Sequence, residues 1–219
     1  MTDIWPWVVL FGLGAFHGIN PGMGWLFAVC LGLQERRRKA VLMALPPIAL
    51  GHALSVGLVV AITALLRAEL HPGVLKYSAA AVLISYGAYR VVRSRHPRWV
   101  GMQVGFRDLT LWSFLMASAH GAGLMLIPVF LATSSADTHA AMHHGRAMAD
   151  HAHYPLIVGA GPLAAAVILH TLGHLLVAGL MALLVYEKLG LTILKTAWFN
   201  IDFAWALALV VTGVIVALM

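Results

Sequence analysis

The stretch LGHLLVAGL, residues 172–180, repeats the stretch LGHALSVGL, residues 50–58, with Leu, Gly, His, Leu, Gly and Leu at matching positions. A His-Gly pair precedes each copy in the chain, beginning at His17 before the first copy and at His120 before the second. Two different motifs that recur in the same order indicate an internal repeat rather than a chance likeness of apolar segments. The histidines are unusual residues to find in such apolar surroundings, and they dominate the functional interpretation.

The composition is typical of a membrane protein. Of the 219 residues, 61% are hydrophobic and 10% are charged, whereas an ordinary soluble domain carries about 25% charged residues. A helix needs about 20 apolar residues to span a bilayer. In lipid, a helix satisfies the hydrogen-bonding groups of its own backbone. No Asp, Glu, Lys or Arg occurs in the segments 4–34, 40–66, 109–136 and 151–186. We expect an all-α membrane protein with six transmembrane helices at about 5–34, 40–66, 72–92, 110–133, 155–186 and 191–218.

Basic residues gather in the connections on one side of the predicted bundle. QERRRKA (34–40) and RVVRSRHPRW (90–99) are strongly basic, whereas the opposite loops hold only Arg67 and Arg146. The positive-inside rule makes the basic side cytoplasmic, with both termini outside a bacterial inner membrane. The net charge of +6 thus orients the chain in its bilayer and does not indicate nucleic acid; a homo-oligomer is compatible with the sequence.

Each half of the repeat contains three predicted helices. We place the first half at 1–99 and the second at 100–219, the latter with a His-rich outer loop at 134–154. An odd number of spans makes the two halves cross the membrane in opposite directions, as in transporters with inverted repeats. Two basic side chains near the ends of the third span, Lys76 and Arg90, are expected to reach the membrane interfaces.

The first predicted helix should be broken near its centre. HGINPGMG contains a proline, which removes a backbone donor, among three glycines. Non-helical backbone at membrane depth is tolerated where it lines a cavity or is buried in protein. We therefore expect a substrate path along the residues Gly18, Asn20, Pro21, Gly22, Gly121 and Asn200.

The histidines of the predicted helices lie at about one depth, which indicates a metal site. His170 and His174 are four residues apart and share a helix face, and we expect them to bind an ion together with His52. Imidazole suits zinc, nickel, cobalt and copper. The alternative is hydrogen bonding between helices, which contributes only about 0.6 kcal/mol per contact. The full set of candidate ligands is His17, His52, His120, His170, His174 and Asp202.

The outer loop adds a second group of candidate ligands. Short His-rich tracts are typical of metal binding, so we expect the loop to capture ions for the central site. A solvated linker without metal is the alternative. The histidines concerned are His139, His143, His144, His151 and His153.

Enzymatic motifs are missing from the sequence. There is no Gly-Lys-Ser or Gly-Lys-Thr phosphate loop, and Cys30 is the only cysteine. HTLGH has the histidine spacing of a zinc-protease helix, but Thr171 stands where the general base would be a glutamate. We expect no enzyme.

The stretch from His17 to Gly57, HGINPGMGWLFAVCLGLQERRRKAVLMALPPIALGHALSVG, resembles the opening of the lysine-exporter superfamily. The resemblance implies six or seven helices in two inverted three-helix halves. The His-rich loop is similar to that of the nickel/cobalt exporter branch. The thiol-disulfide carriers of the superfamily need a cysteine pair that this chain lacks.

Taken together, these features predict a secondary transporter that exports a divalent transition metal ion, with proton coupling as a compatible property. Two alternatives remain at this point. One is an exporter of a basic amino acid or another small solute. The other is a membrane metalloprotein that does not transport, either an enzyme or an accessory factor that loads metal into another protein.

Overall fold

The computed structural model describes residues 4–92, 105–131, 160–189 and 201–218, and all regular structure in these ranges is helical. The all-α prediction is confirmed for this part of the chain. The elements are α1 (Trp5–Ile19), the 3₁₀-helix η1 (Pro21–Met23), α2 (Trp25–Glu35), α3 (Arg38–Glu69), α4 (Pro72–Val92), α5 (Phe106–Ala119), the 3₁₀-helix η2 (Leu124–Leu126), α7 (Ala160–Leu184), the π-helix η3 (Val185–Leu189) and α9 (Ile201–Leu218).

The predicted break in the first helix is confirmed. α1 ends at Ile19, and Asn20 takes an extended conformation with ψ at 120°. The Asn20 side chain accepts a hydrogen bond from the N–H of Gly22 at 2.9 Å, which starts the 3₁₀ turn. Gly24 has a φ of 115°, a left-handed conformation that favours glycine, and α2 begins directly after it.

Within the described ranges, two helices are long and apolar enough to cross a membrane. They are Arg38–Arg67 of α3 and Ala160–Lys188, which covers α7 and most of η3. A third span results if Phe106–Ala119 and Leu124–Leu131 count as one helix bent by 52°. Other apolar helices in the described ranges are shorter, namely Trp5–Ile19, Trp25–Glu35 and Phe203–Leu218. The described helices therefore support two spans, or three with the bent pair, and not the predicted six. α4 is neither among these spans nor among the shorter apolar helices.

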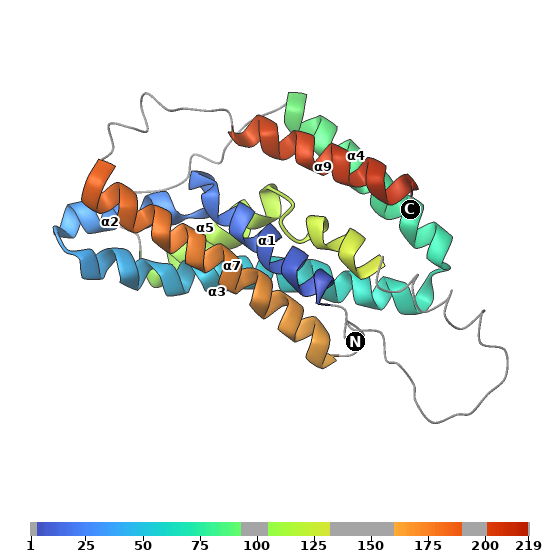
Figure 1. Ribbon diagram of the computed structural model, residues 1–219, viewed down its shortest axis with the longest axis horizontal. Helices are drawn as coiled ribbons and strands as arrows, with labels where there is room; N and C mark the ends of the chain where they lie inside the picture. The colour runs from blue at the N-terminus through green and yellow to red at the C-terminus, as the bar shows by residue number, and fades with distance from the viewer. Residues whose placement is uncertain (1–3, 93–104, 132–159, 190–200, 219) are drawn as a thin grey trace.

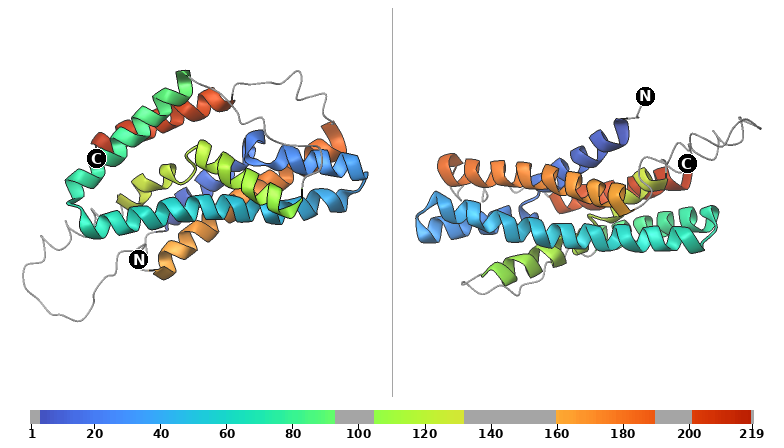
Figure 2. Two further views of the ribbon diagram at one scale, coloured as in Figure 1. Left: turned by 180° about the vertical axis from the view of Figure 1, so that it is seen from behind. Right: turned by 90° about the horizontal axis from the view of Figure 1, so that it is seen from below.

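The helices pack in pairs from different halves of the chain. α1 lies along α7, α3 along α5, and α4 along α9, while α3 and α7 also touch (Figure 1). The α4–α9 pair forms one edge of the molecule, as the view from behind confirms (Figure 2). The helices that carry the paired sequence motifs thus form the interior.

The glycines of the two repeated stretches lie at the closest helix crossings. A Cβ on Gly173 of α7 would meet the backbone of α1 at Phe11 and Ala15. A Cβ on Gly51 of α3 would meet the backbone of α5, including the nitrogen of Phe114 at 2.8 Å. Each Leu-Gly-His stretch therefore presents its glycine to a helix of the opposite half, and its histidine follows directly in the core.

Candidate metal centre

Four of the predicted histidines meet in the interior of the bundle. His17 lies near the end of α1, His52 in the middle of α3, and His170 and His174 on α7. All four side chains have an exposed fraction of 0%. The glycine contacts between α1 and α7 bring the first helix close enough for His17 to join the α7 pair.

Three of the rings are spaced as ligands of one ion would be. The ring centres of His17 and His170 are 5.0 Å apart, those of His52 and His170 5.4 Å, and those of His17 and His52 5.6 Å. A zinc–nitrogen distance of about 2.0–2.1 Å puts an imidazole centre about 3 Å from the ion, and a tetrahedral angle then separates two such centres by about 5 Å. The observed spacings match this value.

Backbone carbonyls of α1 orient two of these rings. Nδ1–H of His17 donates to the carbonyl of Leu13 at 2.6 Å, and Nδ1–H of His170 donates to the carbonyl of Leu10 at 3.1 Å. A neutral imidazole that donates from Nδ1 keeps its lone pair on Nε2. Metal-binding histidines are commonly held in this way by a carbonyl behind the ring. Both Nε2 atoms are thus prepared to act as ligands.

The free nitrogens of the cluster have no hydrogen-bond partner among the described residues. Six buried ring nitrogens are in this state: Nε2 of His17, Nε2 of His170, and both nitrogens of His52 and of His174. Leaving a buried polar group unsatisfied costs about 1–3 kcal/mol, and such groups need an explanation in a native fold. A coordinated cation would satisfy several of them together.

The fourth ring, that of His174, lies closer to its neighbour than the other three rings lie to one another. It stacks on His52 with centres 4.0 Å apart and planes at 2°. This separation is shorter than the value of about 5 Å expected for two ligands of one ion, and neither nitrogen of His174 has a hydrogen bond among the described residues that would orient its ring. The spacing and the backbone hydrogen bonds favour His17, His52 and His170 as the ligand set, whereas sequence spacing predicts His52, His170 and His174.

One ring must turn before these ligands converge. Within the described ranges, no three His, Cys, Asp or Glu side chains are already arranged to hold an ion. The planes of His52 and His170 are nearly parallel, at 10°, so their lone pairs do not meet at one point. The ring nitrogens of His52 make no hydrogen bond within the described part of the chain. His52 is therefore the ring most able to rotate toward the other two.

The remaining histidine of the bundle, His120, faces a guanidinium group. Its Nδ1–H donates to the carbonyl of Met116 at 2.8 Å, and Nη2 of Arg90 donates to its Nε2 at 3.5 Å. Arg90 is 8% exposed, so the expectation that it reaches the membrane interface is wrong. Its position in α4 turns the side chain inward, where the His120 lone pair accepts from it. Nε2 of His120 is consequently engaged by a cationic side chain.

Trp205 of α9 forms an aromatic wall beside the histidines. Its ring centre lies 4.3 Å from that of His17 and 6.4 Å from that of His120, and its Nε1–H donates to the carbonyl of His120 at 2.6 Å. Sequence reasoning did not identify Trp205 or the inward role of Arg90, because neither belongs to a repeated motif.

The other predicted residues are placed as follows. Asn20 is buried at the helix break and its Nδ2 has no partner among the described residues. Gly22 lies near His120, since a Cβ there would be 3.5 Å from its Cε1. Gly121 has a φ of 67°, and Asp202 lies in α9 with its side chain outside the description. The predicted sites that lie outside the described residues are Asn200 and the loop histidines His139, His143, His144, His151 and His153.

No protein family, curated protein or solved structure matches this sequence.

Proposed function

We propose that the protein is a small membrane transporter that moves a divalent transition metal ion through the buried histidine cluster. The observation that carries the proposal is the set of three imidazoles from three helices, spaced at 5.0–5.6 Å, whose buried Nε2 atoms have no hydrogen bond to any described residue. Zinc, nickel, cobalt and copper are the ions that such a nitrogen set suits.

The pairing of helices supports an inverted repeat with six spans. In the proposed repeat, α1, α3 and α4 of the first half correspond to α5, α7 and α9 of the second half. When corresponding helices are exchanged, the α1–α7 contact becomes the α5–α3 contact. The α3–α7 and α4–α9 contacts map onto themselves. All four contacts are present. The helix breaks after α1 and after α5 also correspond, and in such transporters the substrate site lies at the interface of the halves beside broken helices.

The three imidazoles leave a fourth coordination position open, as an exchangeable site requires and a closed structural site does not. We infer that rotation of the His52 ring completes the site when an ion arrives, while the Leu10 and Leu13 carbonyls hold His170 and His17 in place. Rocking of one half against the other would then expose the ion to the opposite side.

The resemblance to the lysine-exporter superfamily gives the proposal its direction and place. Export across a bacterial inner membrane, with the 34–40 turn in the cytoplasm, agrees with the distribution of basic residues. The loop at 134–154 would then bind the ion on the side to which it is released. Proton coupling is compatible with this chemistry, since metal binding displaces protons from imidazoles.

A flux assay in proteoliposomes tests the proposal. Wild-type protein should carry zinc, nickel, cobalt or copper ions to a dye enclosed in the vesicles, and both His17→Ala and His170→Ala should abolish this flux. His71→Ala is the matched control, because His71 is an exposed histidine at the start of α4.

The outcomes separate this proposal from the alternatives. Counterflow of a basic amino acid without metal flux would assign the protein to the solute exporters. Stoichiometric metal binding without flux would indicate a static metalloprotein, and metal flux that persists in both cluster variants would refute the histidine site.

A further inference from the structure

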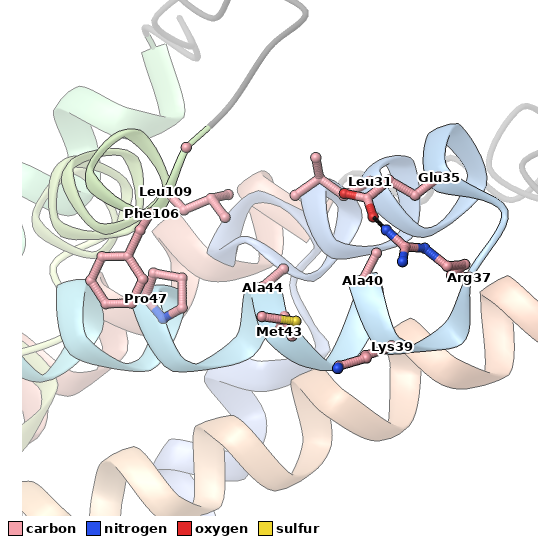
Figure 3. A pocket seen from close by; sticks show the side chains of 11 residues that line it. Leu31, Glu35, Arg37, Lys39, Ala40, Met43, Ala44, Pro47, Phe106 and Leu109 are labelled. Atoms are coloured by element: carbon pink, nitrogen blue, oxygen red, sulfur yellow. Dashed lines mark hydrogen bonds and ion pairs between the residues drawn. The ribbon is translucent and has the colours of Figure 1, made fainter.

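A pocket of about 320 Å³ opens where the basic turn between α2 and α3 meets the start of α5 (Figure 3). It lies apart from the histidine cluster and shares no residue with it. The lining residues come from three helices and the turn, so the pocket is not a groove along a single helix surface. They are Leu31, Glu35, Arg37, Lys39, Ala40, Met43, Ala44, Pro47, Gly105, Phe106 and Leu109.

The two ends of the pocket differ in character. Arg37 and Glu35 lie at one end and are joined by an ion pair of 2.5 Å, whereas Phe106 and Pro47 lie at the other end (Figure 3). Buried apolar side chains, including Ala44 at 2% exposed, form part of the lining between the two ends. A ligand that fits must be charged at one end and apolar at the other.

The charged end is positive in balance. Arg36, Arg37, Arg38 and Lys39 are consecutive. Of these four cations, Arg37 and Lys39 line the pocket, and among the described lining residues they are opposed by the carboxylate of Glu35. The remaining positive charge favours an anionic group at this end.

We propose that the pocket binds an anionic glycerophospholipid of the cytoplasmic leaflet. Its phosphate lies at Arg37 and Lys39, and its acyl chain runs past Met43 and Phe106. The inference rests on the membrane placement in the proposed function. Basic pockets on the cytoplasmic side of transmembrane helices are suited to anionic lipid headgroups.

The exposed apolar rim favours a lipid over a soluble phosphate. Met43 is 65% exposed and Phe106 is 58% exposed, and an acyl chain would cover both. The volume of about 320 Å³ suits a glycerophosphate group, so the chains would extend along the outer surface. A metal ion fits poorly, because the one carboxylate in the lining, that of Glu35, already pairs with Arg37.

Native mass spectrometry of the full chain tests the assignment. The protein is purified in micelles that contain equal amounts of phosphatidylglycerol and phosphatidylethanolamine. Wild type should retain phosphatidylglycerol in preference, and the double variant Arg37→Gln/Lys39→Gln should lower that preference at least about fivefold. Lys188→Gln removes a charge from the same predicted side outside the pocket and should change nothing.

A second variant separates the pocket from surface charge alone. Ala40→Leu fills part of the pocket and keeps every basic residue, so it should also reduce retention of phosphatidylglycerol. Equal retention of the two lipids by wild type overturns the proposal, as does an unchanged preference in the double variant or in Ala40→Leu. Displacement of the lipid by excess inorganic phosphate alone would likewise overturn it, since the apolar end would then contribute nothing.

The lipid and metal experiments fail independently. Lipid retention requires the basic turn and α5, whereas metal binding requires the histidines, so the double variant should bind metal as wild type does. Absent metal flux with intact lipid preference refutes the proposed function only. Absent lipid preference with intact metal flux refutes the lipid site only.

Discussion

The substitution Gly14→Ala should separate α1 from α7 and damage the histidine cluster. Gly14 lies on α1 against α7, and a Cβ at this position would overlap the carbonyl of His170, with His170 C at 2.8 Å and His174 N at 3.1 Å. These obstacles are backbone atoms of a long helix, so no rotation of a side chain can relieve the overlap. The helices must move apart.

Gly12→Ala is a matched control in the same helix, because a Cβ on Gly12 meets no atom of the described residues within 4 Å. Both variants gain helix propensity of up to about 1 kcal/mol. Gly14→Ala also carries the cost of overpacking, which is about 1–3 kcal/mol and should be near the upper end against backbone. The two variants should thus differ by about 3 kcal/mol, or about 6–12 °C in Tm for a chain of this length.

The loss of stability and the loss of metal affinity are measured separately. Thermal unfolding in detergent reports stability, and calorimetric titration reports metal affinity. Displacement of α1 moves the Leu10 and Leu13 carbonyls that orient His170 and His17, so affinity should fall by about 10–100-fold. If Gly14→Ala unfolds at the temperature of Gly12→Ala and binds metal equally well, the close crossing does not hold the site together.

Three further predictions concern the metal site and the topology. His170→Ala should lower metal affinity at least about tenfold, whereas His174→Ala should lower it less because the His174 ring stacks on His52. Calorimetric titration of protein lacking residues 138–153 measures both affinities, and equal losses would contradict the assigned ligand set. Metal binding should weaken in acid, since a protonated imidazole has no lone pair for the ion, and affinity independent of pH in the same titration would exclude imidazole ligands. Ser135→Cys should react with an impermeant thiol reagent in intact cells, whereas labelling only after lysis would reverse the proposed orientation.

Much of the interior could be predicted from the sequence. The Asn-Pro-Gly run marks the helix break because proline and glycine interrupt the hydrogen-bonding pattern of a helix. The Leu-Gly-His repeat identified His52 and His174, and helical spacing added His170 on α7. These signals are local in the chain, so no knowledge of the tertiary structure was needed to find them.

The choice among the histidines could not be predicted in the same way. Whether His52 stacks on His174 or faces His17 depends on the crossing of α1, α3 and α7, which depends on glycine contacts between distant segments. His120 matched the motif as well as His17 did, but Arg90 of α4 donates to its ring. The spacing of residues within one helix cannot show that a guanidinium group from another helix contacts the histidine ring.

The contact between Arg90 and His120 has a consequence for how the proposed halves would work. Two identical halves related by a two-fold axis would give inward-open and outward-open states of equal energy, and the ion gradient alone would decide direction. A buried cation beside His120 removes that degeneracy, because Nε2 of the corresponding His17 has no such partner among the residues that the structure describes. The resting protein would then favour either the inward-open or the outward-open state before any ion binds. Removal of the Arg90 guanidinium would change this preference as well as the affinity for the metal ion.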